Sequence, residues 1–179
     1  MNCIIRPLQI QDWPSVCEIY REGIATGNAT FETELPAWGK WDSNHRKDCR
    51  LAARLANAEE SIASVSLAEN DSPIVGWAAL SPVSSRRVYA GVAEVSVYVA
   101  ASARGHGVGK ALLQAVIKES EASSIWTLQA GIFPENTASI TLHKSLGFRE
   151  VGMRQRVGQL GNVWRDVLLL ERRSATVGT

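Results

Sequence analysis

Three glycines alternate with other residues between Arg104 and Lys110, where the chain reads Arg-Gly-His-Gly-Val-Gly-Lys. This segment lies between an alternating apolar stretch at 94–99 and a longer stretch with the apolar spacing of a helix. Glycine lets the backbone approach a ligand closely, and the first amide groups of a helix have no partners within it. The junction therefore predicts a site for an anion, and for a pyrophosphate in particular.

The glycine spacing separates this segment from two common nucleotide-binding motifs. In the dinucleotide motif G-x-G-x-x-G, the third glycine comes one residue later than Gly109 does here. In the P-loop G-x-x-x-x-G-K-[ST], a glycine stands where this chain has Arg104, and Ser or Thr stands where it has Ala111. From the residues alone, the alternative to an anion site is a glycine-rich turn that leads from a strand into a helix.

Length and composition predict one globular domain that needs no metal or disulfide. The 179 residues are enough for a single core, and we expect the domain to cover residues 1–173, with a frayed tail at 174–179. Cys3, Cys17 and Cys49 show no C-x-x-C spacing, which indicates reduced thiols rather than a disulfide framework or a metal site.

Charge and hydropathy argue against two classes of partner. The 19 Lys and Arg nearly balance the 18 Asp and Glu, so the net charge of +1 creates no overall field that would attract nucleic acid or an acidic membrane. No apolar run approaches membrane-spanning length, and the N-terminus does not read as a signal peptide. We therefore expect a cytoplasmic protein with neither a membrane nor a nucleic-acid partner.

Apolar periodicity predicts a mixed α/β domain with the order β-α-α-β-β-β-α-β-α-β-β. Before the glycine segment we expect a strand at 3–6, a helix at 12–24, a helix at 38–58, two strands at 62–68 and 74–80 forming a hairpin, and a strand at 93–99. After it we expect a helix, a strand at 125–132, a helix from Pro134 that Gly147 ends, and two strands at 148–157 and 163–170.

Several segments together resemble one known family. Arg104-x-x-Gly107-x-Gly109 fits the pattern Q/R-x-x-G-x-G/A, and it is accompanied by Asn28-Ala-Thr-Phe-Glu32, by the strand at 94–99, by Asn136 to Phe148 and by Val157 to Asp166. From about Cys3 to Arg172 the chain is similar to the GCN5-related N-acetyltransferases (GNAT), and within them to the phosphinothricin and methionine sulfoximine N-acetyltransferases. The resemblance implies the GNAT fold, in which helices flank a mixed and mostly antiparallel central sheet. Gln159 departs from the subgroup, which often has an aromatic or basic residue there.

The resemblance implies acetyl-CoA as the co-substrate, and no metal. The residues that would contact acetyl-CoA are Val97, Tyr98 and Val99 along a strand, Arg104, Gly105, His106, Gly107, Val108, Gly109 and Lys110 at the pyrophosphate, and Asn136 and Ser145 near the pantetheine arm. For Asn136 a plain helix cap is the alternative, because Asn is a favoured cap residue.

Acetyl transfer from a thioester to an amine requires a base, and Glu94 stands at the family's position for it. The alternative is a strand carboxylate that pairs with Arg86 or Arg87. His143 stands where the subgroup usually has a histidine, which would act as an acid or hold the amino group, the alternative being an ordinary surface histidine. We expect His45 and His106 to face solvent.

The acceptor site implied by the resemblance consists of Phe31, Glu32, Arg86, Tyr89, Val95 and Ser96. A guanidinium group suits a carboxylate, so Arg86 favours a small amino-acid acceptor, although a solvated loop is an equal alternative. The expected activity is transfer of acetyl to the α-amino group of such an acceptor. Acetylation of another amine or a protein N-terminus, and acyl-CoA binding without turnover, are the alternatives. The subgroup also implies a homodimer, for which Trp164 would supply apolar contact.

Overall fold

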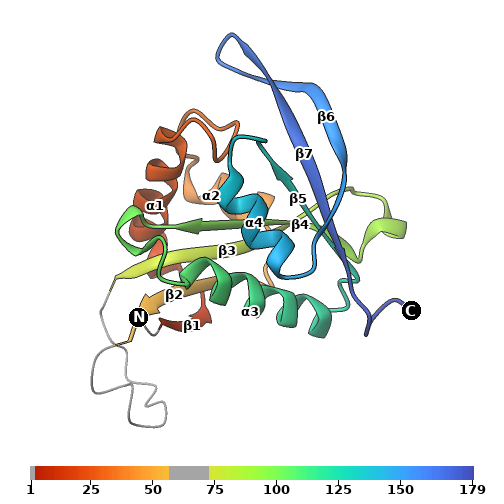
Figure 1. Ribbon diagram of the computed structural model, residues 1–179. Coiled ribbons are helices and arrows are strands. Elements are labelled where there is room, and N and C mark those ends of the chain that lie inside the picture. The colour runs from red at the N-terminus through yellow and green to blue at the C-terminus, as the bar shows by residue number, and fades with distance from the viewer. Residues whose placement is uncertain (1–2, 57–72) are drawn as a thin grey trace.

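A computed structural model describes residues 3–56 and 73–179 (Figure 1). The strands are β1 (Cys3–Pro7), β2 (Leu51–Leu55), β3 (Ile74–Pro82), β4 (Val92–Val99), β5 (Thr127–Ile132), β6 (Arg149–Leu160) and β7 (Val163–Arg173). The helices are α1 (Trp13–Ala25), α2 (Trp38–Asn44), α3 (Val108–Ala122) and α4 (Thr137–Ser145), with short 3-10 turns η1 (Ile10–Asp12), η2 (Arg87–Tyr89) and η3 (Ala101–Ala103). No helix in these described ranges is both long and apolar enough to cross a membrane.

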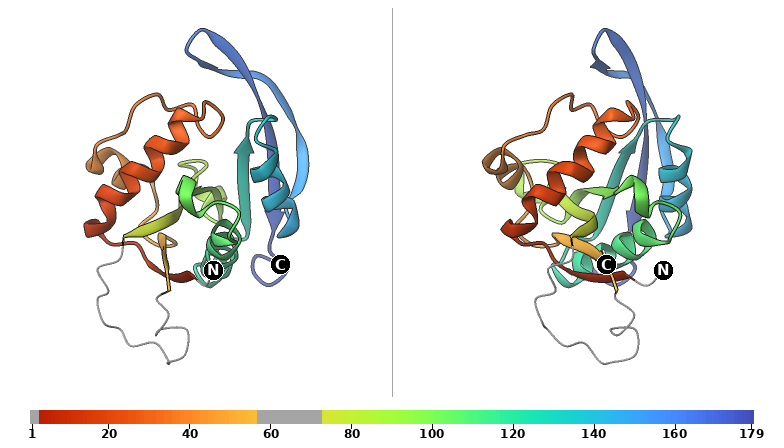
Figure 2. Two further views of the ribbon diagram at one scale, coloured as in Figure 1. Left: turned by 60° about the vertical axis from the view of Figure 1, so that its left-hand side comes forward. Right: turned by 90° about the vertical axis from the view of Figure 1, so that its left-hand side faces the viewer.

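The described strands form one seven-stranded sheet in the order β1-β2-β3-β4-β5-β7-β6. Within residues 3–56 and 73–179, only β4 and β5 pair in parallel, and every other pair of strands is antiparallel. Helices α1 and α2 cover one face of the sheet, and α3 and α4 cover the other (Figures 1 and 2). The predicted fold class and order of elements are confirmed.

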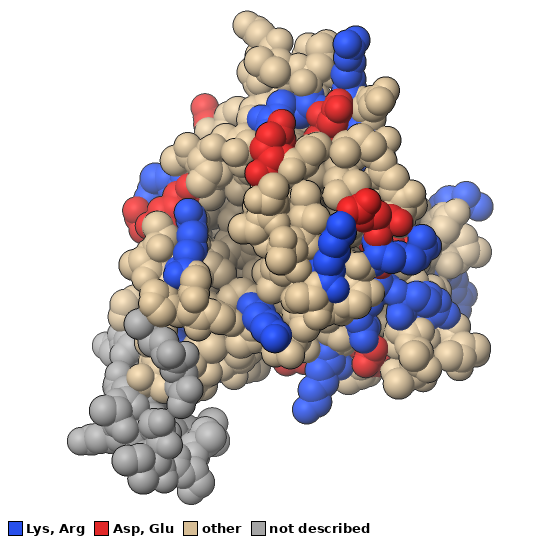
Figure 3. Space-filling view, viewed as in Figure 1, with Lys and Arg blue, Asp and Glu red and all other residues tan. Residues whose placement is uncertain are grey.

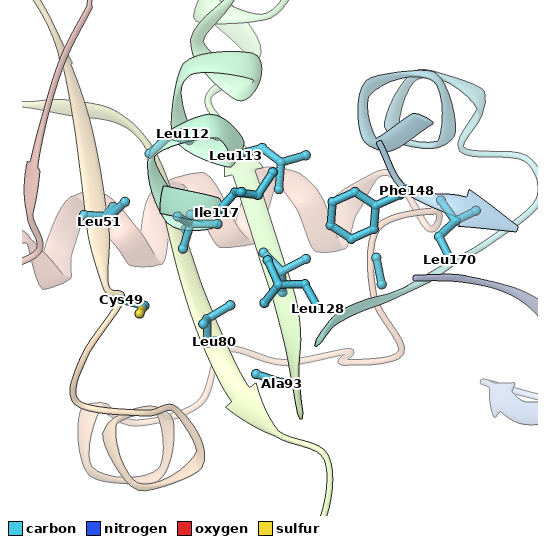
Figure 4. Close-up of a cluster of buried hydrophobic side chains, with 14 of the residues drawn as sticks. Cys49, Leu51, Leu80, Ala93, Leu112, Leu113, Ile117, Leu128, Phe148 and Leu170 are labelled. Atoms are coloured by element: carbon cyan, nitrogen blue, oxygen red, sulfur yellow. The ribbon is translucent and has the colours of Figure 1, made fainter. Parts of the chain in front are cut away.

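Two apolar clusters hold these layers together. On the α3 face, Leu112, Leu113 and Ile117 pack onto Leu80 and Leu128 of the sheet (Figure 4). On the other face, residues of α1 and α2 pack with Trp77 of β3. Because side chains alternate along a strand, each inner strand contributes to both clusters.

The prediction of one long helix at 38–58 is wrong. Helix α2 ends at Asn44, and residues Leu51–Leu55 form the strand β2 between β1 and β3. Leu51, Ala52 and Ala53 are all buried, because this inner strand has apolar cover on both faces. Such a strand reads as a continuous apolar run, which sequence periodicity does not distinguish from a buried helix. The predicted strand at 62–68 lies outside the described residues, and β3 pairs with β2.

The C-terminal residues are tied to the domain, contrary to the expected frayed tail. Ser174 is buried, and its hydroxyl donates a hydrogen bond to Glu121 Oε1 at 3.0 Å. Arg173 donates to the carbonyl of Val177 at 2.9 Å and also to that of Gly178. The end of β7 and the residues that follow it are therefore held by side-chain hydrogen bonds.

The hairpin of β6 and β7 extends well beyond the rest of the domain (Figures 1 and 2). Its described surface carries five exposed apolar side chains, which we call the hairpin patch: Val151, Met153, Val157, Val163 and Trp164. Elsewhere, Lys and Arg are interspersed with Asp and Glu on the face seen in Figure 3, so no single basic patch dominates that face.

Candidate functional site

The sheet opens where β4 and β5 stop pairing. Their last paired residues are Glu94 and Gln129, although β4 continues to Val99 and β5 to Ile132. A cleft of about 900 Å³ lies in this region, lined by the second half of β4, the end of β5, the glycine segment, the start of α4 and the loop at 28–32. Beyond Glu94, the backbone groups of these two strands therefore no longer pair with each other, and the strands border the cleft instead.

The glycine segment forms one end of the cleft. Gly105 and Gly107 have φ of +77° and +83°, a region that other residues adopt only with strain. The first hydrogen bond of α3 runs from the Ala111 amide to the Gly107 carbonyl at 3.0 Å, so the amides of residues 108–110 precede the helical ladder. Arg104, Gly105, Gly107, Val108, Gly109 and Lys110 all line the cleft, whereas His106 is exposed and does not. Free amides, a helix N-terminus and two cationic side chains make this end suitable for a pyrophosphate.

Glu94 lies in the cleft at the point of strand separation. Burial by the surrounding protein raises the pKa of its carboxyl group, while a hydrogen bond from the Gly131 backbone and the charge of Arg154 lower it. Burial is the largest of the three effects, so the pKa is above the ordinary value. The Glu94 side chain is nevertheless accessible to solvent. A carboxylate with a raised pKa is a stronger proton acceptor near neutral pH than one with the ordinary pKa.

His143 is buried on α4 and lines the cleft. Its Nδ1 lies 2.8 Å from the Ser139 carbonyl oxygen, so Nδ1 carries the proton and donates, and Nε2 is left as an acceptor. Nε2 is buried and has no hydrogen-bond partner among the residues that the structure describes. Burial also lowers the pKa of the imidazole, which favours the neutral ring.

Asn136 caps α4 and also ties the helix to another part of the cleft. Its side-chain oxygen accepts from the Ser139 amide at 3.2 Å, and its Nδ2 donates to the Asn28 carbonyl at 3.2 Å. Arg165 of β7 donates to the Gly27 carbonyl and to Asn28 Oδ1, each at 3.0 Å. The alternative of a helix cap for Asn136 is thus confirmed, and the same side chain holds the loop at 28–32 in place.

Comparison with known proteins agrees with this geometry. The family model described as "Acetyltransferase (GNAT) family" matches residues 27–148, which include the loop at 28–32, Glu94, the glycine segment and His143. The chain belongs to the GNAT family. It is therefore an N-acetyltransferase.

Individual relatives of this acetyltransferase match over nearly its whole length. It is 32% identical to a phosphinothricin N-acetyltransferase of Alcaligenes faecalis over 95% of this chain and 82% of the relative. It is 30% identical to an L-methionine sulfoximine/L-methionine sulfone acetyltransferase of Pseudomonas aeruginosa over 96% of this chain and 94% of the relative. A crystal structure of a phosphinothricin acetyltransferase from Sinorhizobium meliloti in complex with AcCoA matches with a TM-score of 0.81 and 26% identity, covering 99% of this chain and 91% of that one.

Two phenylalanines, Phe31 and Phe133, form an aromatic part of the cleft wall. Phe31 meets Phe133 edge to face, with ring centroids 4.8 Å apart. A Cβ atom on Gly158 would lie 2.8 Å from the Phe31 ring, so a glycine is needed there for this close approach. Of the residues predicted to contact the acceptor, Phe31, Glu32, Val95 and Ser96 line the cleft.

The structure does not bring Arg86 and Tyr89 into this cleft. Both are exposed on the loop between β3 and β4, where the Arg86 guanidinium lies 5.6 Å from the Tyr89 ring. Ser145 also lies outside the lining, and its hydroxyl donates to the Leu142 carbonyl at 2.7 Å. The residues predicted along the acetyl-CoA path, Val97, Tyr98, Val99 and Asn136, do line the cleft.

Two residues of this acetyltransferase site were missed from the sequence. His45, expected to face solvent, is half-buried against Trp41 and lines the cleft. The positive charge of Arg154 in β6 lowers the pKa of Glu94, although 60 positions separate the two residues in the chain. Neither residue lies in a recognisable motif, so only tertiary structure reveals them. Among the described residues, no group of three or more His, Cys, Asp or Glu is arranged to hold a metal ion.

Proposed function

We propose that this acetyltransferase moves acetyl from acetyl-CoA directly to the α-amino group of a small amino-acid analogue of the phosphinothricin, methionine sulfoximine or methionine sulfone type. The observation that supports this most strongly is the position of Glu94. It lies in the same cleft as the glycine segment, at the point where β4 and β5 separate. The part of β4 that β5 leaves unpaired thus leads from the proposed base toward the proposed anion site.

The described residues fit acetyl-CoA along this path. The pyrophosphate would lie over residues 105–110, where amides precede the helical ladder of α3. The pantetheine arm would run beside β4 at residues 97–99, which β5 leaves unpaired. The thioester would then lie close to Glu94, and Asn136 would border the arm from the head of α4.

The proposed reaction begins when Glu94 accepts a proton from the ammonium group of the acceptor, directly or through water. The neutral amine attacks the thioester carbon, a C–N bond forms and the C–S bond breaks. The amine's second proton goes to the departing sulfur, and the proton on Glu94 returns to solvent. The raised pKa of Glu94, caused mainly by burial, makes it a suitable acceptor for the first of these protons.

In this proposal His143 acts as a neutral residue beside the reaction. Its Nδ1 proton is directed to Ser139 and its pKa is lowered by burial, so near neutral pH the ring has an acceptor at Nε2 and no proton to give from that atom. This supports a role in holding an N–H or S–H group of the reactants over a role as general acid.

An amino-acid acceptor also needs a partner for its carboxylate. Arg86 remains our proposal from the family resemblance, with Tyr89 beside it, and would have to approach from the loop that precedes β4. Arg154 is a second cation on the acceptor side, and its effect on Glu94 supports a position within electrostatic reach of the amine. Phe31 and Glu32 would contact the acceptor side chain.

Homodimer formation and a cytoplasmic location are part of the same proposal. The hairpin patch exposes apolar surface on an arm that extends beyond the domain, which suits contact with a second copy.

A thiol-release assay over a panel of acceptors tests the proposal. We expect CoA release from acetyl-CoA with methionine sulfoximine, methionine sulfone and phosphinothricin, and much slower release with polyamines and with peptides bearing a free N-terminus. Equal turnover of amines that lack a carboxylate would remove the amino-acid acceptor and leave acetyl transfer intact. Acetyl-CoA binding without turnover of any amine would indicate a sensor.

A further inference from the structure

His45 lies on the same face of the sheet as Glu94. Tyr98 of β4 stacks on Trp77, with ring centroids 4.6 Å apart, and Glu94 is four residues earlier on the same strand. Side chains an even number of positions apart project from the same face, so Glu94 shares this face with Tyr98. His45 meets Trp77 edge to face at 6.4 Å, which places it on this face as well.

The backbone brings His45 close to the acceptor end of the cleft. The next residue, Arg46, donates from its amide to the Leu80 carbonyl at 2.8 Å. Leu80 is followed in β3 by Ser81, whose cross-strand partner is Glu94. His45, Ser81 and Glu94 all line the cleft.

The His45 ring is held by contacts on several sides. It stacks on Trp41 with ring centroids 4.3 Å apart, and its Nδ1 lies 2.7 Å from the Trp41 carbonyl oxygen. The turn that carries it is fastened by Arg50, a buried residue whose guanidinium donates to the carbonyls of His45 and Asp42, each at 2.7 Å. Arg50 also forms an ion pair with Asp42 at 2.5 Å. A ring held in this way has lost most of its rotational freedom before any ligand binds.

The state of the ring follows from these contacts. Because a carbonyl oxygen only accepts, Nδ1 must carry the proton, and in the neutral ring Nε2 is an acceptor. Burial lowers the pKa of His45, and the charge of Arg50 lowers it further, whereas the Trp41 carbonyl and Asp42 raise it. Burial is the largest effect, so the neutral form prevails near pH 7.

We propose that His45 is an acceptor-positioning residue of this enzyme, and that its Nε2 accepts a hydrogen bond from the ammonium group of the acceptor while Glu94 takes the proton that leaves. The inference rests on the proposed function, because it requires an amine acceptor at this end of the cleft. It assigns a rigid neutral hydrogen-bond acceptor to the α2 side of the acceptor site. Two acceptors directed at one nitrogen orient the lone pair that must reach the thioester carbon.

The test compares His45→Phe with His45→Gln. Phenylalanine preserves stacking on Trp41 and removes the acceptor, whereas glutamine places an amide oxygen near the position of Nε2. We expect His45→Phe to raise the KM for the best amine of the panel by about 10-fold or more, since a lost hydrogen bond to a charged group has this effect. The KM for acetyl-CoA should stay within about twofold of wild type. His45→Gln should recover most of the loss.

A control and a direct readout separate positioning from folding. Ser43→Ala changes an exposed residue of α2 and should match wild type. In wild-type protein saturated with CoA and labelled with ¹⁵N-histidine, methionine sulfone should shift the Nε2 signal of His45. An unchanged KM for the amine in a folded His45→Phe protein would overturn the inference. So would an Nε2 chemical shift of His45 that does not change when the acceptor binds. If the panel shows an amine other than an amino acid, the acceptor class proposed above fails, and the same two comparisons still decide the role of His45 with that amine.

Discussion

The carboxylate of Glu94 accepts a hydrogen bond from the backbone of Gly131, two residues beyond the point where their strands last pair. A Cβ atom on Gly131 would lie 3.5 Å from Glu94 Oε1 and 3.2 Å from Val167. The Glu94 carboxylate is therefore held beside the gap between β4 and β5 by the strand on the other side of that gap. In our proposal, the opening for the pantetheine arm and the group that activates the amine thus have one structural origin.

Replacing Glu94 with glutamine should lower kcat by about 10²- to 10⁴-fold, because the amide does not accept the ammonium proton. The dissociation constant for acetyl-CoA, measured by calorimetry, should stay close to wild type because the glycine segment is unchanged. Wild-type turnover near neutral pH in Glu94→Gln would show that the carboxylate is structural.

Replacing Arg154 with glutamine should raise the pKa of Glu94 further, because the positive charge of Arg154 lowers it. The acid limb of kcat/KM against pH should then move to higher pH, since that limb reports the base of the free enzyme. Arg156→Gln is the matched control, because Arg156 is exposed on the same strand and is not among the groups that act on Glu94. Coincident acid limbs in wild type and Arg154→Gln would exclude electrostatic coupling of the two residues.

Local signals predicted the parts of the site that lie in continuous motifs. The glycine segment, Glu94 and the head of α4 were found because glycine spacing, an acidic residue in an apolar strand and a cap residue each leave a mark in the sequence. The strand β2 was misassigned because a strand covered on both faces has no period of two. His45 lies in the cleft lining only through the register of β3 with β4, and Arg154 comes within electrostatic reach of Glu94 only because β6 pairs with β7 at the edge of the sheet. No local pattern carries such long-range pairing.

The same limit explains why the sequence did not show that the Arg86 side chain lies outside the cleft. Its loop joins β3 to β4 at the Glu94 end, as predicted, yet the side chain is exposed and lies against Tyr89. Loop side chains are set by contacts that charge and spacing do not encode, so the sequence located the loop and did not locate the guanidinium.

Replacing Gly107 with valine should weaken acetyl-CoA binding, because φ of +83° is unfavourable for valine and the side chain would stand beside the amides of α3. Gly161→Val is a matched control at the tip of the β6–β7 hairpin, where φ is +58° and, as at Gly107, no atom lies within 4 Å of an added Cβ. Both variants should lose about 1–3 kcal/mol of unfolding free energy. Only Gly107→Val should lose affinity in calorimetry, and equal affinities in the two proteins would contradict a pyrophosphate site at this loop.

Stability should fall as pH drops below about 6.5, because burial lowers the pKa of both His45 and His143 from the value of 6.5. Below that pH the unfolded chain binds protons that the folded protein does not bind, so acid favours unfolding. Glu94 acts in the opposite direction, since its raised pKa lets the folded protein bind a proton before the unfolded chain does as pH falls.

Urea unfolding of wild type and of a His45→Gln/His143→Gln double variant, at pH 7.5 and 5.5, separates the contribution of the two histidines to the free energy of unfolding from that of Glu94. The double variant should lose less stability between the two conditions. An NMR titration that placed either imidazole above pH 6.5 would contradict the assignment.

Trp164 should contribute to a dimer contact through the hairpin patch. Its side chain is 56% exposed on an arm that projects from the domain. Exposed apolar side chains on such an arm are stabilised when a second copy covers them. We expect light scattering to give the mass of a dimer at micromolar concentration, and Trp164→Arg to shift that mass toward the monomer.

Ile10→Arg is the matched control, because Ile10 is 57% exposed in η1, far from the arm in the sequence. A similar change in charge at that position should leave the dimer intact. Dissociation of the dimer by both variants would point to a general effect of added charge. A wild-type monomer would show that the hairpin is not an interface. It would leave the catalytic proposal unaffected, because Glu94, the glycine segment and His143 are all supplied by one chain.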